Sequence, residues 1–186
     1  MNFQTRKTHA GFSIVESMMT IAIAAILCAV SLPALGGLVH TTQSRVAREA
    51  MFTSLNLARN TAVSRQGEIV ICASNDGEHC SGGQWWQGGW IVFQDANHDG
   101  KSDANEAIIQ AVQAQPGVTV LTSADRTHIT YRSDGTSPGT NATITFCDAK
   151  RHRSAGTIIV SNAGRARQGN ATAEQDAICA QSDPNA

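Results

Sequence analysis

Residues 11–39, GFSIVESMMTIAIAAILCAVSLPALGGLV, are the stretch that decides the fold of this chain. No Asp, Glu, Lys or Arg stands between Glu16 and Arg45, a run of 28 residues, and a helix of that length is long enough to cross a bilayer. The preceding residues 1–11 are polar and carry two basic residues but no acid. Positive charge ahead of an apolar span keeps that end in the cytoplasm. We therefore expect a leader at 1–11 and a transmembrane helix at 12–39, with the rest of the chain exported.

Glu16 is the unusual residue of this stretch, because a carboxylate beside an apolar run needs a partner. A charge at the centre of a bilayer costs up to about 2.5–3.5 kcal/mol. If the chain is cleaved after Gly11, Phe12 gains an α-ammonium group and Glu16 becomes the fifth residue of the product. The ammonium group of a neighbouring subunit can then neutralise the carboxylate inside an apolar filament core. A secretory signal peptide, whose apolar region has only about 7–15 residues, and a single-span anchor that never polymerises are the alternatives.

Residues 40–65 continue this helix with an amphipathic pattern. Apolar side chains recur at spacings of four, four, three and four, which places them on one helical face. These residues are Ala47, Met51, Leu55, Ala58 and Ala62. Gly67 is a plausible C-terminal stop. The sequence therefore predicts one long helix from about residue 12 to residue 65, with an apolar stripe on its second half.

Residues 66–186 have the alternation of short β-type runs and turn residues that is typical of an exported β-rich domain. The expected strands are 68–73, 89–94, 107–112, 118–121, 128–132, 142–147 and 157–161, followed by a C-terminal tail. A helix packed on an antiparallel sheet is the simplest architecture for this order of elements, which makes the fold class α+β.

Four of the five cysteines lie beyond the apolar stretch. Cys28 lies within it, and an even set of four in an exported region suggests two disulfides with three possible pairings. Cys72 and Cys80 flank the turn-like stretch NDGEH, which favours Cys72–Cys80 with Cys147–Cys179. Zinc ligation is the alternative, but the paired CxxC spacing of zinc sites is missing.

Positive charge gathers late in the chain. Two short clusters, KRHR and GRAR, contribute Lys150, Arg151, Arg153, Arg165 and Arg167. No acidic residue stands between Asp148 and Glu174, so this stretch has a local positive field. The whole chain has a formal net charge of −1, and any site for a polyanion must therefore be local.

The GRAR cluster has the chemistry of a phosphate site. A spacing of two places the side chains of Arg165 and Arg167 on the same side of an extended loop, and Gly164 permits an unusual backbone angle just before them. Guanidinium forks suit phosphate oxygens and contact them without regard to base sequence. The alternative is that these residues are solvated loop charges.

The order of the strands separates the two clusters. If 142–147 and 157–161 form a hairpin, KRHR is its turn and GRAR lies at the opposite end, roughly 17–20 Å away. Arg132 ends the preceding strand and should fall near GRAR. We therefore rank Arg165 and Arg167 first as phosphate ligands, then Arg132, with the KRHR residues as outer contacts.

The N-terminal motif G-FSIVE, with Gly11, Phe12 and Glu16, resembles the type IV prepilin signal. The resemblance implies cleavage after Gly11 by a prepilin peptidase, methylation of the new N-terminus, and a role for Glu16 in assembly with other pilins. Pro33 stands where type IVa pilins carry a proline that kinks the helix. It also implies insertion in the inner membrane by a single span, with a periplasmic domain that later joins an extracellular pilus.

The exported domain, with GGWIVFQDANHDGKSDANE after its first strand, resembles the GspH/FimT family of minor pilins and pseudopilins. Gly164-Arg165-Ala166-Arg167 resembles the GRxR motif of the FimT minor pilins, which bind DNA during natural transformation. The resemblance implies a pilin-like fold and non-specific binding of double-stranded DNA. A structural minor pilin, or a type II secretion pseudopilin that primes or caps assembly, is the alternative function.

Residues 95–106 offer a further hypothesis. Oxygen-bearing side chains stand at positions 1, 3, 5, 9 and 12, with glycine at position 6, as in an EF-hand calcium loop. The flanking residues read as strands, however, and Asp, Asn and Gly also make ordinary turns. A calcium-regulated adhesin and a plain polar loop both remain open, and we expect no cofactor.

Enzymatic function has little support in the sequence. The six histidines are scattered, and the chain has no HExxH, GxSxG, Walker or GxGxxG motif. We therefore expect a protein that acts by assembly and binding.

Overall fold

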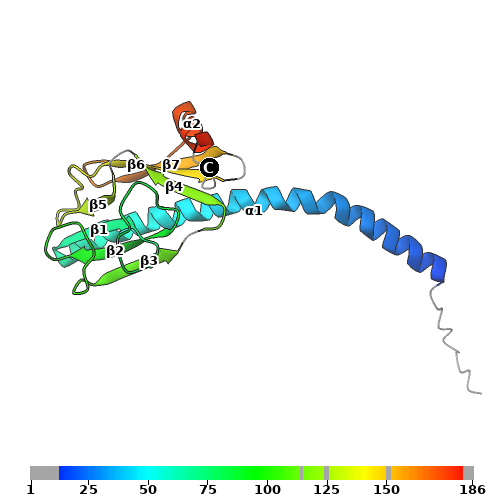
Figure 1. Ribbon diagram of the computed structural model, residues 1–186, viewed down its shortest axis with the longest axis horizontal. Coiled ribbons are helices and arrows are strands. Elements are labelled where there is room, and N and C mark those ends of the chain that lie inside the picture. Colours follow the sequence, from blue (N-terminus) through cyan, green and yellow to red (C-terminus); the bar gives the residue numbers. More distant parts are fainter. Residues whose placement is uncertain (1–12, 114, 124–125, 150–151, 182–186) are drawn as a thin grey trace, which may run out of the picture. The chain divides into compact units, whose positions relative to one another are not determined.

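The computed structural model describes residues 13–113, 115–123, 126–149 and 152–181, and for residues 30–41 it describes the backbone alone. The chain divides into two compact units, Met1–Val39 and His40–Ala186. The order of elements is one long helix, eight strands and one short helix (Figure 1). This is the α+β class that the sequence predicts.

The helix α1 (Ile14–Arg65) is a single element of 52 residues, in agreement with the long helix expected from the sequence. In the first unit the side chains of residues 13–29, including Glu16, are exposed. Gly11 and Phe12 lie outside the described residues, and Pro33 is described only by its backbone within α1.

The sequence leads us to expect a membrane span over 12–39. Among the residues that the structure describes, no helical stretch combines the length and the apolarity that crossing a membrane requires.

The second unit contains two antiparallel sheets of four strands each. The first sheet has the order β3-β2-β1-β5 and the second has the order β4-β6-β7-β8. The strands of the first sheet are β1 (Glu68–Ala73), β2 (Gly89–Asp95), β3 (Ile108–Gln113) and β5 (His128–Tyr131). Those of the second are β4 (Val118–Thr122), β6 (Ala142–Asp148), β7 (Arg153–Val160) and β8 (Ala166–Gly169).

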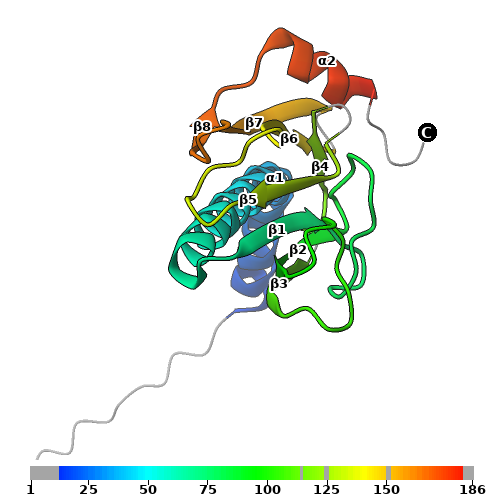
Figure 2. The same cartoon turned by 90° about the vertical axis from the view of Figure 1, so that its left-hand side faces the viewer.

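The two sheets cover neighbouring sides of the second half of α1 (Figure 2). The five residues of the predicted stripe, Ala47, Met51, Leu55, Ala58 and Ala62, are all at most 1% exposed. They form one core with inward residues of both sheets, such as Ile71 and Phe146. The hydrophobic stripe therefore organises the domain, because burial of each large side chain contributes roughly 1.5–3 kcal/mol.

Some polar groups inside this core are linked by hydrogen bonds. Trp90 is buried, and its Nε1 donates a hydrogen bond to Ser54 Oγ at 2.9 Å. Ser54 Oγ in turn donates to Gln110 Oε1 at 2.7 Å. These two bonds tie α1 to β2 and β3, since a buried donor without a partner would cost free energy.

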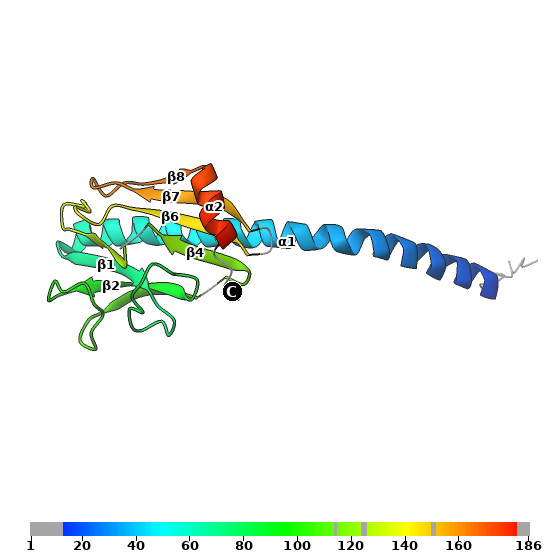
Figure 3. The ribbon, with the colours of Figure 1, turned by 45° about the horizontal axis from the view of Figure 1, so that its top comes forward.

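Both disulfides have the pairing that the sequence favours, Cys72–Cys80 and Cys147–Cys179. The first closes the loop after β1. The second joins β6 to the helix α2 (Ala173–Gln181), which lies beside β7 and β6 (Figure 3). Zinc ligation by these four cysteines is therefore wrong.

Two elements were not predicted. The C-terminal tail contains α2, and the GRAR residues were expected on a loop, whereas Ala166 and Arg167 belong to β8. The four residues of β8 contain no β-branched or aromatic side chain, so they carry no local strand signal. These residues form a strand because they pair with the edge of β7, from Val160 opposite Ala166 to Thr157 opposite Gly169.

Candidate nucleic-acid interface

Arg165 and Arg167 lie at the turn that joins β7 to β8. The turn is closed by hydrogen bonds from Ser161 N–H to Arg165 O at 3.1 Å and from Gly164 N–H to Ser161 O at 2.8 Å. Ala166 packs against the core. Since successive side chains point to opposite faces of a strand, Arg167 projects on the outer side of β8. Arg165 directly precedes the strand, and both arginines are exposed.

The charge of these two arginines is not used elsewhere in the described structure. Across residues 13–113, 115–123, 126–149 and 152–181, no hydrogen bond or ion pair engages either guanidinium group. The neighbouring Gln168 points toward α1 instead and donates to Glu49 Oε1 at 3.1 Å. Both guanidinium groups can therefore meet a ligand from solvent.

Arg132 lies at the same end of the domain. It follows β5 and begins a turn closed by Arg132 N–H to Thr136 O at 2.9 Å and Gly135 N–H to Arg132 O at 2.8 Å. Ser137, which follows Thr136 in the sequence, donates its N–H to Asn162 O at 2.9 Å. The turn 132–137 is thus hydrogen-bonded to the turn 161–165, and Arg132 is exposed beside it.

Gly164 is required by this contact. Its φ of 72° lies in the left-handed region that non-glycine residues avoid. A Cβ at this position would also overlap the carbonyl oxygen of Gly135. Position 164 therefore requires glycine, because the two turns approach each other closely there.

Sequence reasoning missed Arg59, which contacts both turns from α1. Its Nε donates to Gly135 O at 2.9 Å and its Nη2 donates to Ala163 O at 3.4 Å. In the sequence Arg59 is one of several arginines in the amphipathic segment 40–65. Nothing in its local pattern distinguishes it from the arginines that face solvent.

Arg153 of the KRHR cluster lies at the other end of β7, where it begins the strand. In the register of the β6–β7 hairpin its backbone stands opposite Asp148. With eight residues in β7, the two ends are about 23 Å apart. Arg153 lines a cleft of about 490 Å³ with Ser44, Arg45, Arg48 and Asp148, among others. Lys150 and Arg151 lie outside the described residues.

The Asp95–Glu106 loop uses its oxygen atoms internally. Asp95 Oδ2 accepts the Gly100 N–H at 2.8 Å, and Glu106 Oε1 accepts the Ala96 N–H at 2.8 Å. Asn97 Nδ2 donates to Asp103 Oδ2 at 3.0 Å. In the part of the chain that the structure describes, no group of three or more His, Cys, Asp or Glu residues could hold a metal ion. The geometry is that of a hydrogen-bonded polar loop.

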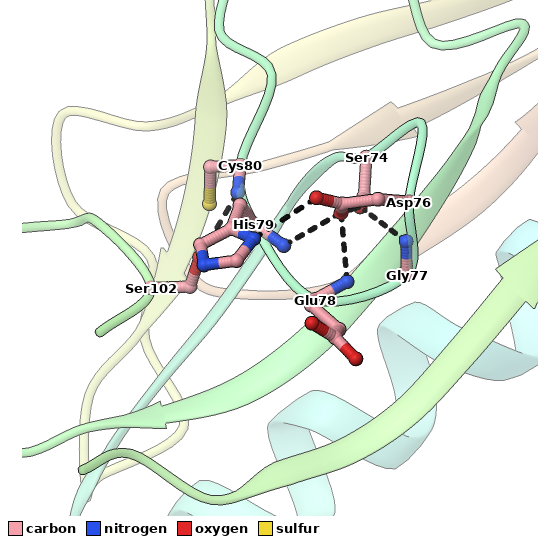
Figure 4. A network of polar contacts seen from close by, with 7 residues as sticks. All are labelled: Ser74, Asp76, Gly77, Glu78, His79, Cys80 and Ser102. Atoms are coloured by element: carbon pink, nitrogen blue, oxygen red, sulfur yellow. Dashed lines mark hydrogen bonds and ion pairs between the residues drawn. The ribbon is translucent and has the colours of Figure 1, made fainter. Parts of the chain in front are cut away.

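A second polar network fixes the neighbouring loop beside Cys80 (Figure 4). The Asp76 carboxylate accepts the backbone N–H groups of His79 and Glu78, which lowers the pKa of that carboxyl well below its usual range. The same carboxylate contacts His79 Nδ1 at 2.9 Å and raises the pKa of the imidazole. Cys80 N–H donates to Ser102 Oγ at 2.9 Å. These contacts join the disulfide loop to the Asp95–Glu106 loop and have no evident ligand-binding role.

The sequence of this chain matches the profile of a known protein family. The profile of the family described as type II transport protein GspH matches residues 47–164, and the sequence has no significant match among curated proteins. The match ends at Gly164, so Arg165 and Arg167 lie just beyond it.

Solved structures share the fold. Two crystal structures of the type IV minor pilin FimU of Pseudomonas aeruginosa are similar. One is 24% identical with a TM-score of 0.54, covering 68% of this chain and 88% of the other. The second is 25% identical with a TM-score of 0.52, covering 67% and 90%. The minor pseudopilin EpsH of the Vibrio cholerae type II secretion system is more distant, at 10% identity and a TM-score of 0.49, covering 69% and 97%. Since the family profile covers more than half of the sequence, this chain belongs to the GspH family of minor pilins and pseudopilins.

Proposed function

We propose that this protein is a minor pilin of a type IV pilus that binds extracellular double-stranded DNA, without sequence preference, for uptake in natural transformation. Membership of the GspH family supports the coarse function, assembly with other pilins in a filament. The observation that carries the DNA-binding proposal is the position of Arg165 and Arg167. They stand at the start of the short strand β8, both are exposed, and neither guanidinium group has a partner among the described residues.

The geometry favours phosphate as the ligand. A guanidinium group presents a planar fork of donors that matches phosphate oxygens, and side chains spaced by two residues on a strand lie about 6.6 Å apart along it. Such contacts go to the DNA backbone and carry no sequence information. Arg132 is the third candidate ligand, although the Asp134 carboxylate near it offsets part of its charge.

Few phosphates would be engaged by one subunit. Binding should therefore be weak for each copy and should weaken as salt rises. Several copies, or several pilins of one filament, would raise the overall affinity without new contacts. Arg153, about 23 Å away along β7, would act as an outer contact, together with Lys150 and Arg151.

The N-terminal segment carries the rest of the proposal. Cleavage by a prepilin peptidase between Gly11 and Phe12 would create the ammonium group that Glu16 of a neighbouring subunit pairs with. Before assembly the chain would sit in the inner membrane with its β-rich domain in the periplasm, and Pro33 would kink the helix. This part rests on the sequence motif GFSIVE.

The second candidate function is that of a structural minor pilin or type II secretion pseudopilin that primes or caps assembly. The family description, a type II transport protein, favours it. In that case Arg165 and Arg167 would be solvated charges, and their replacement would leave filament formation and secretion unchanged.

The deciding experiment measures DNA binding by residues 40–186, a fragment that contains every side chain found buried among the described residues. Fluorescence anisotropy with a short duplex at several salt concentrations would compare it with the Arg165→Gln/Arg167→Gln variant. We expect binding to weaken at least about tenfold and the salt slope to fall by up to about 1.8, the value for two phosphate contacts. Lys101→Gln, which removes an exposed positive charge from the Asp95–Glu106 loop, is the control, and we expect it to change binding by less than about threefold.

Two outcomes would contradict the proposal. Wild-type fragment that does not bind DNA at low salt would favour the structural function. Full binding by the double variant would exclude Arg165 and Arg167 as the site.

A further inference from the structure

The side chain of Arg59 joins two turns that are distant in the sequence. It reaches Gly135 O from Nε at 2.9 Å and Ala163 O from Nη2 at 3.4 Å, across 76 and 104 residues of sequence. The first carbonyl belongs to the turn that begins with Arg132. The second lies two residues before Arg165. One guanidinium group therefore connects the two turns that carry the candidate phosphate ligands.

The backbones of the two turns are packed too closely for ordinary residues. A Cβ on Gly135 would lie 3.0 Å from Val63 Cγ2 and 3.3 Å from Arg59 Nε, and a Cβ on Gly164 would overlap Gly135 O. Ser137 N–H also donates to Asn162 O at 2.9 Å. Both glycines have positive φ, 77° and 72°. Glycine therefore stands at two constrained positions: a side chain at Gly164 would separate the two turns, and a side chain at Gly135 would press on Val63 and Arg59 of α1.

Arg59 supplies the donors that this contact needs. Gly135 is buried, so its carbonyl oxygen needs a partner, and the planar guanidinium group of Arg59 can reach the exposed Ala163 carbonyl at the same time. The half-buried side chain also lies near Tyr131, where burial raises the pKa of the phenol and the Arg59 charge opposes that rise. Arg59 thus extends from α1 toward both turns and near β5. We therefore regard it as a residue that donates hydrogen bonds within the fold and does not contact the ligand.

We propose that Arg59 is the positioning residue that holds the Arg132 turn against the Arg165 turn, so that Arg132, Arg165 and Arg167 form one phosphate-binding surface. This inference rests on the proposed DNA binding for its functional consequence. Its structural part, the connection of the two turns by Arg59, is independent of any ligand.

Arg59→Lys tests the connection because it keeps the positive charge but removes the planar fork. A single ammonium group on a different stem cannot reproduce both bonds with the same geometry. Arg65→Lys is the matched control. Arg65 also lies in the C-terminal part of α1, but it donates to the side chain of Gln94 at 3.3 Å and contacts neither turn.

The first readout is amide hydrogen exchange in the fragment 40–186. In Arg59→Lys we expect the Ser137 amide to lose protection by about tenfold, the equivalent of one hydrogen bond. The amides of Phe146 and Cys147, at the end of β6 opposite the turns, should keep their protection, as should Ser137 in Arg65→Lys. Unchanged Ser137 exchange in Arg59→Lys would overturn the proposal. General loss of protection would mean that Arg59 merely stabilises the fold, which also overturns it.

The second readout is a double-mutant cycle in DNA binding. Arg59→Lys and Arg132→Gln should each weaken binding by about three- to tenfold, and the two together should weaken it no more than either alone. Additive effects would show that Arg59 acts independently of Arg132 and would overturn the positioning role. If wild-type protein binds no DNA while Ser137 exchange responds as expected, the proposed function fails and the connection of the turns stands.

Discussion

The two ends of the second sheet are held together by different means. At the end with Arg165, two turns are joined by glycine contacts, one backbone hydrogen bond and the Arg59 guanidinium. At the other end the Cys147–Cys179 bridge fastens α2, and Ser154 N–H donates to Asp176 Oδ1 at 2.8 Å. One end is therefore held by hydrogen bonds and close packing, whereas the other has a covalent bond in addition to a hydrogen bond.

The arginines of the two ends differ in the same way. Near the β6–β7 turn, Arg48 donates to Ala155 O at 3.1 Å, and Asp148 lines the cleft that Arg153 borders. At the β7–β8 turn the positioning is done by Arg59, and the guanidinium groups of Arg165 and Arg167 have no partner within the described residues. The difference teaches that a count of basic residues does not identify a site, because Arg48 and Arg59 are engaged by backbone carbonyl groups of the fold, whereas no such contact engages Arg165 and Arg167 among the described residues.

Removal of the Cys147–Cys179 bridge should give the largest effect. Closing a loop across a separation of 32 residues stabilises the fold by about 3.7 kcal/mol in the loop-entropy treatment. Cys147→Ala/Cys179→Ala should lower the free energy of unfolding in urea by about that amount, against about 2.5 kcal/mol for the shorter Cys72–Cys80 loop. DNA binding below the transition should remain within about twofold of wild type. Its loss in a folded variant would show that the two ends are coupled.

Gly164→Ala should have the next largest effect, at the other end. The variant combines a strained positive φ, which costs about 1–2 kcal/mol, with the overlap on Gly135 O. Gly139→Ala is the control, since Gly139 has a similar φ of 74° but a Cβ added there would meet no heavy atom within 4 Å. We expect urea unfolding to show a loss for Gly164→Ala at least about 1 kcal/mol greater than for Gly139→Ala. Equal losses would mean that the turns separate without cost.

The smallest effect concerns Asp134, in the turn that Arg132 begins. Hydrogen bonds from the Thr136 hydroxyl and the Thr136 N–H lower the pKa of the Asp134 carboxyl below its ordinary 3.8. The contribution of this group to stability is therefore fully present above about pH 4 and is lost as pH falls through the lowered pKa.

Thr136→Val removes the hydroxyl and keeps the shape of the side chain. A carboxyl NMR titration should show that the pKa of Asp134 rises toward 3.8 in this variant. An unchanged pKa would show that the turn at the Arg165 end is less ordered than its hydrogen bonds indicate. Asp76, whose pKa is lowered by the backbone N–H groups of His79 and Glu78, is the internal control and should titrate as in wild type.

The sequence by itself determined the elements whose signals are local. The stripe from Ala47 to Ala62 and the strand runs such as Glu68–Ala73 are visible because helical and strand periodicity repeat within a few residues. The cysteines that flank NDGEH led to both disulfides. The ranking of GRAR over KRHR came from strand order, which places the two clusters at opposite ends of a hairpin.

Only the tertiary structure decided the rest. Strand β8 exists because β7 offers its edge, and α2 is fastened by a cysteine 32 residues away. Arg59 meets carbonyl groups 76 and 104 residues later, and Gly164 must be glycine because Gly135 lies against it. A contact between distant residues leaves no periodic pattern in either segment. For that reason the sequence indicated which arginines carry the charge, whereas the fold decided which of them are left exposed to use it.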